Sequence, residues 1–165
     1  MMKKSIRATA TKYVVPKVFA QLTEVERAIK NSTKTNDTET QLTLLVKLDG
    51  ANYADIGRYE EKNNKLESYL KALLGPNTEF GFFYNREIGT IFVAGSLSEQ
   101  FLHDIDGKKI GELSEGPYGI LRGLGISAPE ATDAVKRLGK GKYLLLVRGN
   151  RFAQNDFEAI WDKTG

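Results

Sequence analysis

The chain has 165 residues, of which 41% are hydrophobic and 27% are charged, and its formal net charge is +3 at pH 7. These values fit one soluble globular domain with a core of ordinary size, and they exclude a disordered chain. The lack of cysteine excludes disulfides, thiolate catalysis and cysteine metal sites. No apolar run reaches the roughly 20 residues that span a bilayer, and the N-terminal segment lacks the apolar part of a secretory signal. We therefore expect a cytoplasmic protein without a membrane contact.

The N-terminal residues differ in character from the rest of the chain. The sequence predicts a flexible arm over residues 1–12 and a single domain over residues 13–165. Lys3, Lys4 and Arg7 give the arm a small basic cluster, but the other basic residues are interspersed with acidic ones. Nucleic-acid binders more often carry a basic patch or run, so this charge pattern disfavours nucleic acid as a partner.

The first half of the chain alternates strand and helix patterns. Pro16 cannot donate to a strand ladder, which favours the edge of a sheet for the first strand. Thr23 and Glu26 match a capping box at the start of a helix. Periodicity and punctuation predict the following elements: a strand at 13–19, a helix at 23–31, a polar loop at 31–40, a half-buried strand at 41–48 whose even-numbered residues share a face, and a helix at 52–74 that Gly75-Pro76 ends.

The second half contains hairpin signals and a capped helix. Ser127 and Glu130 form a second capping box, and Gly139 ends that helix. The Gly-rich stretch at 114–125 carries no predicted element. The patterns predict the following elements: a hairpin at 79–94, a small hairpin within 100–113 around Asp106-Gly107, a helix at 127–138, a strand at 142–148 that should be the most buried, and a closing helix after residue 150.

This order of elements has hairpins and too few βαβ units for a doubly wound sheet. It predicts an α+β domain with a mixed or antiparallel sheet and helices packed on one face. The first strand-helix-strand unit and the last helix-strand unit fit a ferredoxin-like or related plan with a central insertion.

A family resemblance lies in the block from about residue 120 to residue 165. The turn Leu124-Gly125-Ile126, the helix Ser127–Leu138, the step Gly141-Lys142, the strand Tyr143–Val147 and the turn Arg148-Gly149 follow one another there. This succession resembles the C-terminal half of bacterial heat-induced general stress proteins and their glycine-zipper relatives. The segment VFAQLTEVERAIKN near the start resembles the first strand and helix of the same family.

The middle of the chain departs from that family. Many relatives carry a long apolar Gly/Ala-rich segment there, whereas this chain has charged and aromatic residues and keeps only Gly116, Gly119, Gly123 and Gly125. The resemblance implies a module without established catalytic residues and without membrane insertion. We therefore expect a non-enzymatic, stress-related module that acts by binding an unknown small molecule or by forming a homo-oligomer.

A short glycine motif offers an alternative function. Gly123, Gly125, Ser127 and the following alanine match G-x-G-x-x-A before a helix, where glycines can let the backbone approach a pyrophosphate. Arg148 and Arg151, which follow the next strand, could then bind the phosphate of an NADP- or ATP-type nucleotide. The favoured interpretation is a tight turn before a capped helix.

Other candidate groups have simpler structural interpretations. His103 beside Asp104 could act as a general base, but an exposed strand histidine is the more common case. The acidic residues around Gly107 do not have calcium-loop spacing and favour a hairpin turn. Aromatic residues of the 79–94 hairpin favour core or subunit packing, with base stacking by a weak nucleic-acid binder as the alternative: Phe80, Phe82, Phe83, Tyr84 and Phe92. We expect no catalytic residue, metal or cofactor.

Overall fold

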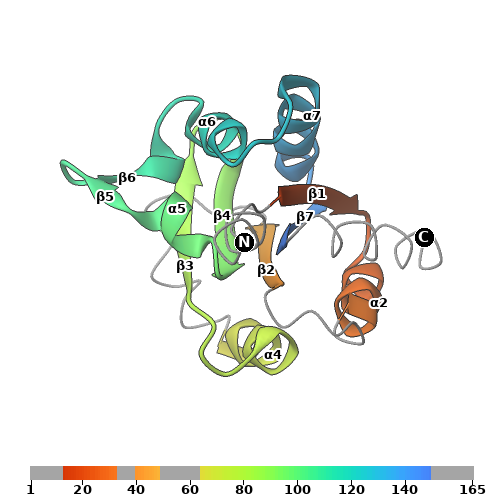
Figure 1. Ribbon diagram of the computed structural model, residues 1–165. Coiled ribbons are helices and arrows are strands. Elements are labelled where there is room, and N and C mark those ends of the chain that lie inside the picture. Colours follow the sequence, from red (N-terminus) through yellow and green to blue (C-terminus); the bar gives the residue numbers. More distant parts are fainter. Residues whose placement is uncertain (1–12, 33–39, 49–63, 150–165) are drawn as a thin grey trace, which may run out of the picture.

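The computed structural model describes residues 13–32, 40–48 and 64–149 of the chain. A five-stranded antiparallel sheet forms its centre (Figure 1). Its strands lie in this spatial order: β1 (Tyr13–Phe19), β7 (Tyr143–Gly149), β2 (Gln41–Leu48), β4 (Gly89–Gly95) and β3 (Phe80–Asn85). The last of these strands in the sequence, β7, therefore lies between the first two.

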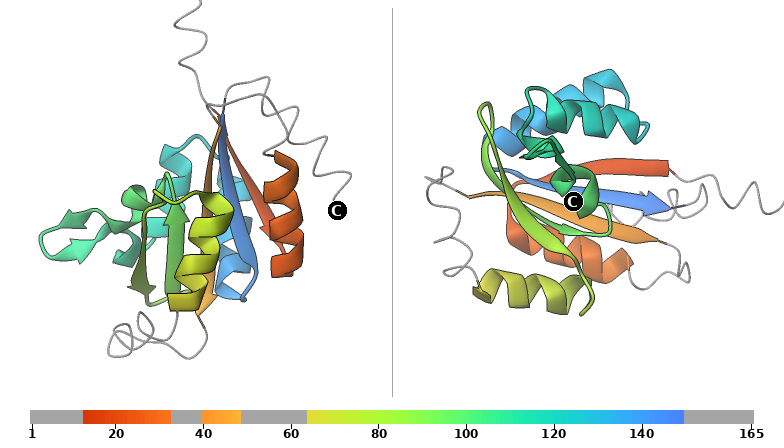
Figure 2. Two further views of the ribbon diagram at one scale, coloured as in Figure 1. Left: turned by 90° about the horizontal axis from the view of Figure 1, so that it is seen from below. Right: turned by 90° about the vertical axis from the view of Figure 1, so that its left-hand side faces the viewer.

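Helices cover both faces of this sheet, as Figure 2 shows. One face carries α2 (Leu22–Ser32) and α4 (Asn64–Leu74). The other face carries α5 (Ser98–Leu102), α6 (Gly116–Gly123) and α7 (Ala128–Gly139). A projecting hairpin of β5 (Asp104–Ile105) and β6 (Lys108–Lys109) and the 3-10 turn η2 (Ile110–Glu112) connect α5 to α6. Within the described residues no helix is long and apolar enough to cross a membrane.

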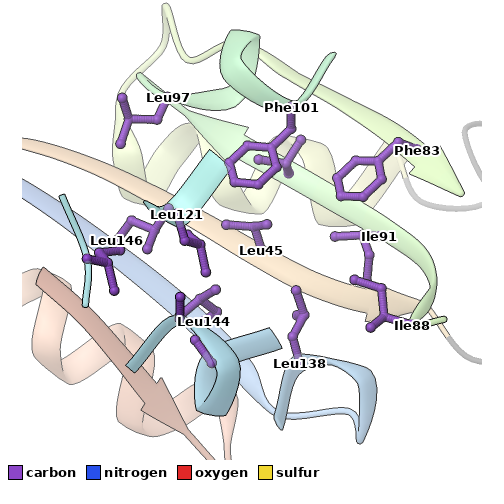
Figure 3. Close-up of a cluster of buried hydrophobic side chains, with 14 residues drawn as sticks. Leu45, Phe83, Ile88, Ile91, Leu97, Phe101, Leu121, Leu138, Leu144 and Leu146 are labelled. Atoms are coloured by element: carbon purple, nitrogen blue, oxygen red, sulfur yellow. The ribbon is translucent and has the colours of Figure 1, made fainter. Parts of the chain in front are cut away.

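Two apolar cores fill the space between the layers, because the central strands are apolar on both sides. Leu44 of β2 contacts the core beneath α2 and α4, and its neighbour Leu45 contacts the core beneath α5, α6 and α7. Both side chains are fully buried. Figure 3 shows the second core, where Leu121 of α6 and Leu138 of α7 meet strand residues such as Leu144.

The prediction of an α+β fold is confirmed, but the prediction that helices pack on one face is wrong. The alternation of even-numbered apolar residues in 41–48 indicated a half-buried strand, yet Leu45 on the opposite side is equally buried. Consecutive apolar residues in β2, β4 and β7 require cover on both faces.

The specific ferredoxin-like plan is not confirmed. The chain passes from β2 through α4 to β3, and from β4 through α5, α6 and α7 to β7, and each connection crosses one intervening strand. These two connections lie on opposite faces of the sheet, start from antiparallel strands and run across the sheet in opposite directions. One crossover is therefore right-handed and the other is left-handed.

Most of the predicted elements are present, including β1 at the sheet edge, both hairpins and the helix that starts after Ser127. The first capping box is wrong: α2 begins at Leu22, and the carboxylate of Glu24, not Glu26, accepts the backbone N–H groups of Ala20 and Gln21 at 3.2 and 3.0 Å. Helix α6 was not predicted. The arm at 1–12, residues 52–63 of the helix predicted at 52–74, and the closing helix after residue 150 lie outside the described residues.

Candidate functional site

A cleft of about 640 Å³ opens beside the C-terminal half of α7. We call it the α6–α7 cleft. Three segments line it: the end of β3 with the following turn, the start of α6, and α7. Its lining residues are these: Asn85, Glu87, Ile88, Glu115, Pro117, Tyr118, Thr132, Val135, Lys136, Gly139 and Lys140.

Asn85 holds the first wall of the α6–α7 cleft in place. Its side chain is only 2% exposed. Its amide nitrogen donates to the carbonyl oxygens of Gly111 and Leu113 at 3.0 and 3.1 Å, and its oxygen accepts the N–H groups of Glu87 and Ile88 at 2.9 and 3.3 Å. One side chain therefore joins the β3–β4 turn to the segment that leads into α6.

Glu115 has an unusual backbone conformation at the second wall. It precedes α6 with φ 58° and ψ 15°, in the left-handed region that non-glycine residues rarely adopt. The start of α6 lies very close to η2 there, because a Cβ atom on Gly116 would overlap the carbonyl oxygen of Ile110. This conformation costs about 1–2 kcal/mol relative to ordinary helical backbone, and such strain collects at functional sites.

The third wall is the end of α7, which packs closely on the sheet. A Cβ atom on Gly139 would lie 3.0 Å from Cγ2 of Ile88, so glycine permits this close approach. The ammonium group of Lys47 on β2 donates to the carbonyl oxygen of Gly139 at 2.7 Å. It thereby supplies a partner for one of the carbonyl groups that have none within α7 at its C-terminal end. Lys136 and Lys140 stand one helical turn apart at the rim and are exposed.

The α6–α7 cleft thus combines an apolar floor with a charged rim. Ile88, Pro117 and Val135 supply the floor, and the hydroxyl groups of Tyr118 and Thr132 add hydrogen-bonding capacity. Within the described ranges, no group of three or more His, Cys, Asp and Glu residues could hold a metal ion. The arrangement suits reversible binding of a small molecule that has both apolar and charged parts.

A second cleft, of about 610 Å³, lies at the C-terminal end of α4. Its lining comes from the start of β2, the turn after α4 and the residues around Gly95, and among the described residues of that lining only Glu79 is charged. Because the described lining of this second cleft carries one charged residue, whereas that of the α6–α7 cleft carries four, we treat the α6–α7 cleft as the candidate site.

The predicted glycine site lies at the other end of α7. Gly125 has φ 96°, and its N–H donates to the carbonyl oxygen of Arg122, while the N–H of Ile126 donates to that of Leu121. These two bonds form the Schellman motif that ends α6. Gly123 is the last residue of α6. The expected tight turn is therefore present, and it uses the N–H groups that a phosphate would need.

The start of α7 offers a phosphate few further donors. Ser127 caps the helix by accepting the N–H of Glu130 at 3.4 Å, and its hydroxyl donates to the Glu130 carboxylate at 3.0 Å. Pro129 has no N–H to offer. A carboxylate thus already stands where the positive end of the helix dipole would attract an anion.

Of the two arginines predicted to bind phosphate, only Arg148 lies within the described residues. Arg148 lies near the end of β7, and strand alternation places it on the face that carries α7, together with Leu144 and Leu146. Arg151 lies outside the described residues. Nucleotide binding by the glycine turn and these two arginines stays a prediction.

Of the remaining candidates, the hairpin turn and the aromatic packing are as the sequence favoured, whereas His103 follows α5 and precedes β5 and does not lie in a strand. His103 and Asp104 are exposed at the base of the β5–β6 hairpin. Asp106 and Gly107 form its two-residue turn, with φ values of 53° and 87°. Among the hairpin aromatics, three are buried in the cores and two are half-buried: Phe82, Phe83 and Phe92 are buried, and Phe80 and Tyr84 are half-buried.

Sequence reasoning missed the α6–α7 cleft. Its residues come from three segments that share no local motif, and the segment that carries Glu115 and Tyr118 had no predicted element. Pro117 in the first turn of α6 was the one local signal that could have indicated a helix there.

A comparison with protein-family models finds no matching family, and comparisons with curated proteins and with solved structures find no significant similarity.

Proposed function

We propose that this chain is a non-enzymatic binding module of the general-stress type, and that the α6–α7 cleft holds its ligand. The observation that carries the proposal is the cleft itself, whose volume of about 640 Å³ suits a small molecule. Its apolar floor and charged rim supply both binding area and selectivity. The strained backbone of Glu115 at the rim supports the same assignment.

A fragment screen by two-dimensional amide NMR tests this proposal. We expect bound fragments to shift the amide signals of Glu87, Tyr118 and Lys136. Thr132 is exposed and lines the cleft, so Thr132→Phe should place a ring in the cleft and abolish these shifts. Asp133→Phe changes the next exposed residue outside this cleft and serves as the matched control.

Two results would contradict the proposal. Fragment shifts that avoid the cleft, or that survive Thr132→Phe as fully as Asp133→Phe, would show that the ligand site lies elsewhere. Turnover of a small molecule that is lost on changing His103 or Asp104 would overturn the non-enzymatic part.

Self-association is a second candidate, and the outer edge of β1 favours it. β1 is a terminal strand of the sheet, and all seven of its residues are half-buried. At the opposite edge of the sheet, Lys109 donates to the carbonyl oxygen of Phe82 at 2.6 Å and covers part of β3. Pro16 and Lys17 in the middle of β1 limit the length of any strand pairing. Light scattering after size-exclusion chromatography tests this candidate, and a monomer at all concentrations would exclude it.

A further inference from the structure

The charges around the α6–α7 cleft form two groups of opposite sign. Glu87, in the β3–β4 turn, and Glu115, before α6, form an acidic rim. Lys136 and Lys140, at the end of α7, form a basic rim. All four side chains are exposed.

These opposite charges, all on described residues, do not form ion pairs with one another. Within the part of the chain that the structure describes, no ion pair joins the acidic rim to the basic rim. On α7 the ion pair is instead between Arg137 and Asp133, at 3.2 Å and outside the cleft lining. A ligand in the cleft can therefore meet both an anionic and a cationic wall.

Resting on the proposed function above, we infer that the α6–α7 cleft binds amphoteric α-amino acids or short peptides with an apolar side chain. The ligand's ammonium group faces the acidic rim, and its carboxylate faces the basic rim. Its side chain covers the apolar floor of Ile88, Pro117 and Val135. The hydroxyl groups of Tyr118 and Thr132 can bond to the carboxylate or to a peptide group.

The charge arrangement also selects against other small ions. The four rim charges sum to zero, so a phosphate-rich ligand meets the acidic rim and a polyamine meets the basic rim, each at the cost of like-charge repulsion. Exposed ion pairs are individually weak. We therefore expect weak binding, with dissociation constants of about 1 mM.

The test compares L-leucine, its dipeptide and two blocked forms of L-leucine by titration with two-dimensional amide NMR. L-leucine and L-leucyl-L-leucine carry both charges, N-acetyl-L-leucine lacks the ammonium group, and L-leucinamide lacks the carboxylate. We expect L-leucine or the dipeptide to shift the cleft amides. Each blocked charge should raise the dissociation constant by roughly fivefold.

Two double variants assign each charge to its rim. In Glu87→Gln with Glu115→Gln, L-leucine and N-acetyl-L-leucine should bind equally. In Lys136→Gln with Lys140→Gln, L-leucine and L-leucinamide should bind equally. The matched control, Glu99→Gln with Lys108→Gln, changes exposed residues that do not line the cleft and should keep both differences.

The outcomes separate this inference from the proposed function. If neither L-leucine nor the dipeptide shifts the cleft amides at about 20 mM, well above the millimolar affinity expected, the inference is overturned. Equal binding of all four ligands to the unmodified protein would overturn it as well. Fragments that bind in the cleft while amino acids do not would leave the proposed function standing and refute the amphoteric ligand alone.

Discussion

Two buried threonines in the sheet allow a matched test of hydrogen-bond energetics in this protein. Thr43 on β2 and Thr90 on β4 are both 0% exposed. The hydroxyl oxygen of Thr43 accepts the backbone N–H of Leu97 at 2.8 Å. The hydroxyl of Thr90, by contrast, has no hydrogen-bond partner among the described residues. Valine has nearly the shape of threonine, so each Thr→Val change removes a hydroxyl and leaves the packing intact.

The two changes should have opposite signs. Thr43→Val leaves the buried N–H of Leu97 without a partner and should lower the free energy of unfolding by about 1–3 kcal/mol. Thr90→Val removes a desolvated hydroxyl that gains nothing in the fold, and should raise it by up to about 1 kcal/mol. At roughly 2–4 °C per kcal/mol for a chain of this size, Tm falls by about 2–12 °C in the first variant and rises by up to about 4 °C in the second.

Urea unfolding gives the free energies, and calorimetry gives Tm. The m-value should stay the same in both variants, because neither change alters the surface exposed on unfolding. A loss of more than about 1 kcal/mol in Thr90→Val would refute the reasoning, since it would mean that the hydroxyl of Thr90 has a partner whose loss is costly.

Four other changes probe the cleft walls and helix α6 by thermal unfolding. Gly119→Ala should add about 0.5–1 kcal/mol of stability because its Cβ meets open space in α6, whereas Gly116→Ala should cost about 1–3 kcal/mol through overlap with Ile110; equal effects would contradict this packing. Asn85→Ala removes four hydrogen bonds and should cost about 3 kcal/mol or more, and a neutral result would exclude its bridging role. Glu115→Gly should stabilise the fold by about 1 kcal/mol while weakening L-leucine binding; destabilisation would show that φ 58° carries no strain.

Local sequence signals predicted the elements whose boundaries are set by residues within or next to them. Pro16 placed β1 at an edge, Ser127 marked the start of α7, and Asp106-Gly107 supplied the two positive φ angles that a tight hairpin needs. Apolar runs likewise located β2, β4 and β7.

Features that depend on distant contacts could not be predicted in this way. Helix α6 contains three glycines and has low intrinsic helix propensity. Its stability comes from packing, since Pro117 and Leu121 are buried and Leu121 belongs to the core that includes strand residues of the sheet. Without α6 there was no reason to expect Glu115 and Lys136 to line the same cleft.

The central position of β7 constrains how this protein can fold during synthesis. β1 pairs with β7 from Tyr13 opposite Gly149 to Phe19 opposite Tyr143, and β2 pairs with the other side of β7. The inner edges of β1 and β2 can therefore pair only after the ribosome has made β7, about a hundred residues after β2 and more than a hundred after β1. Until then each presents an unpaired inner edge to other chains. Contacts of such long sequence separation slow folding, and these inner edges cannot complete their pairing until residue 149 has left the ribosome.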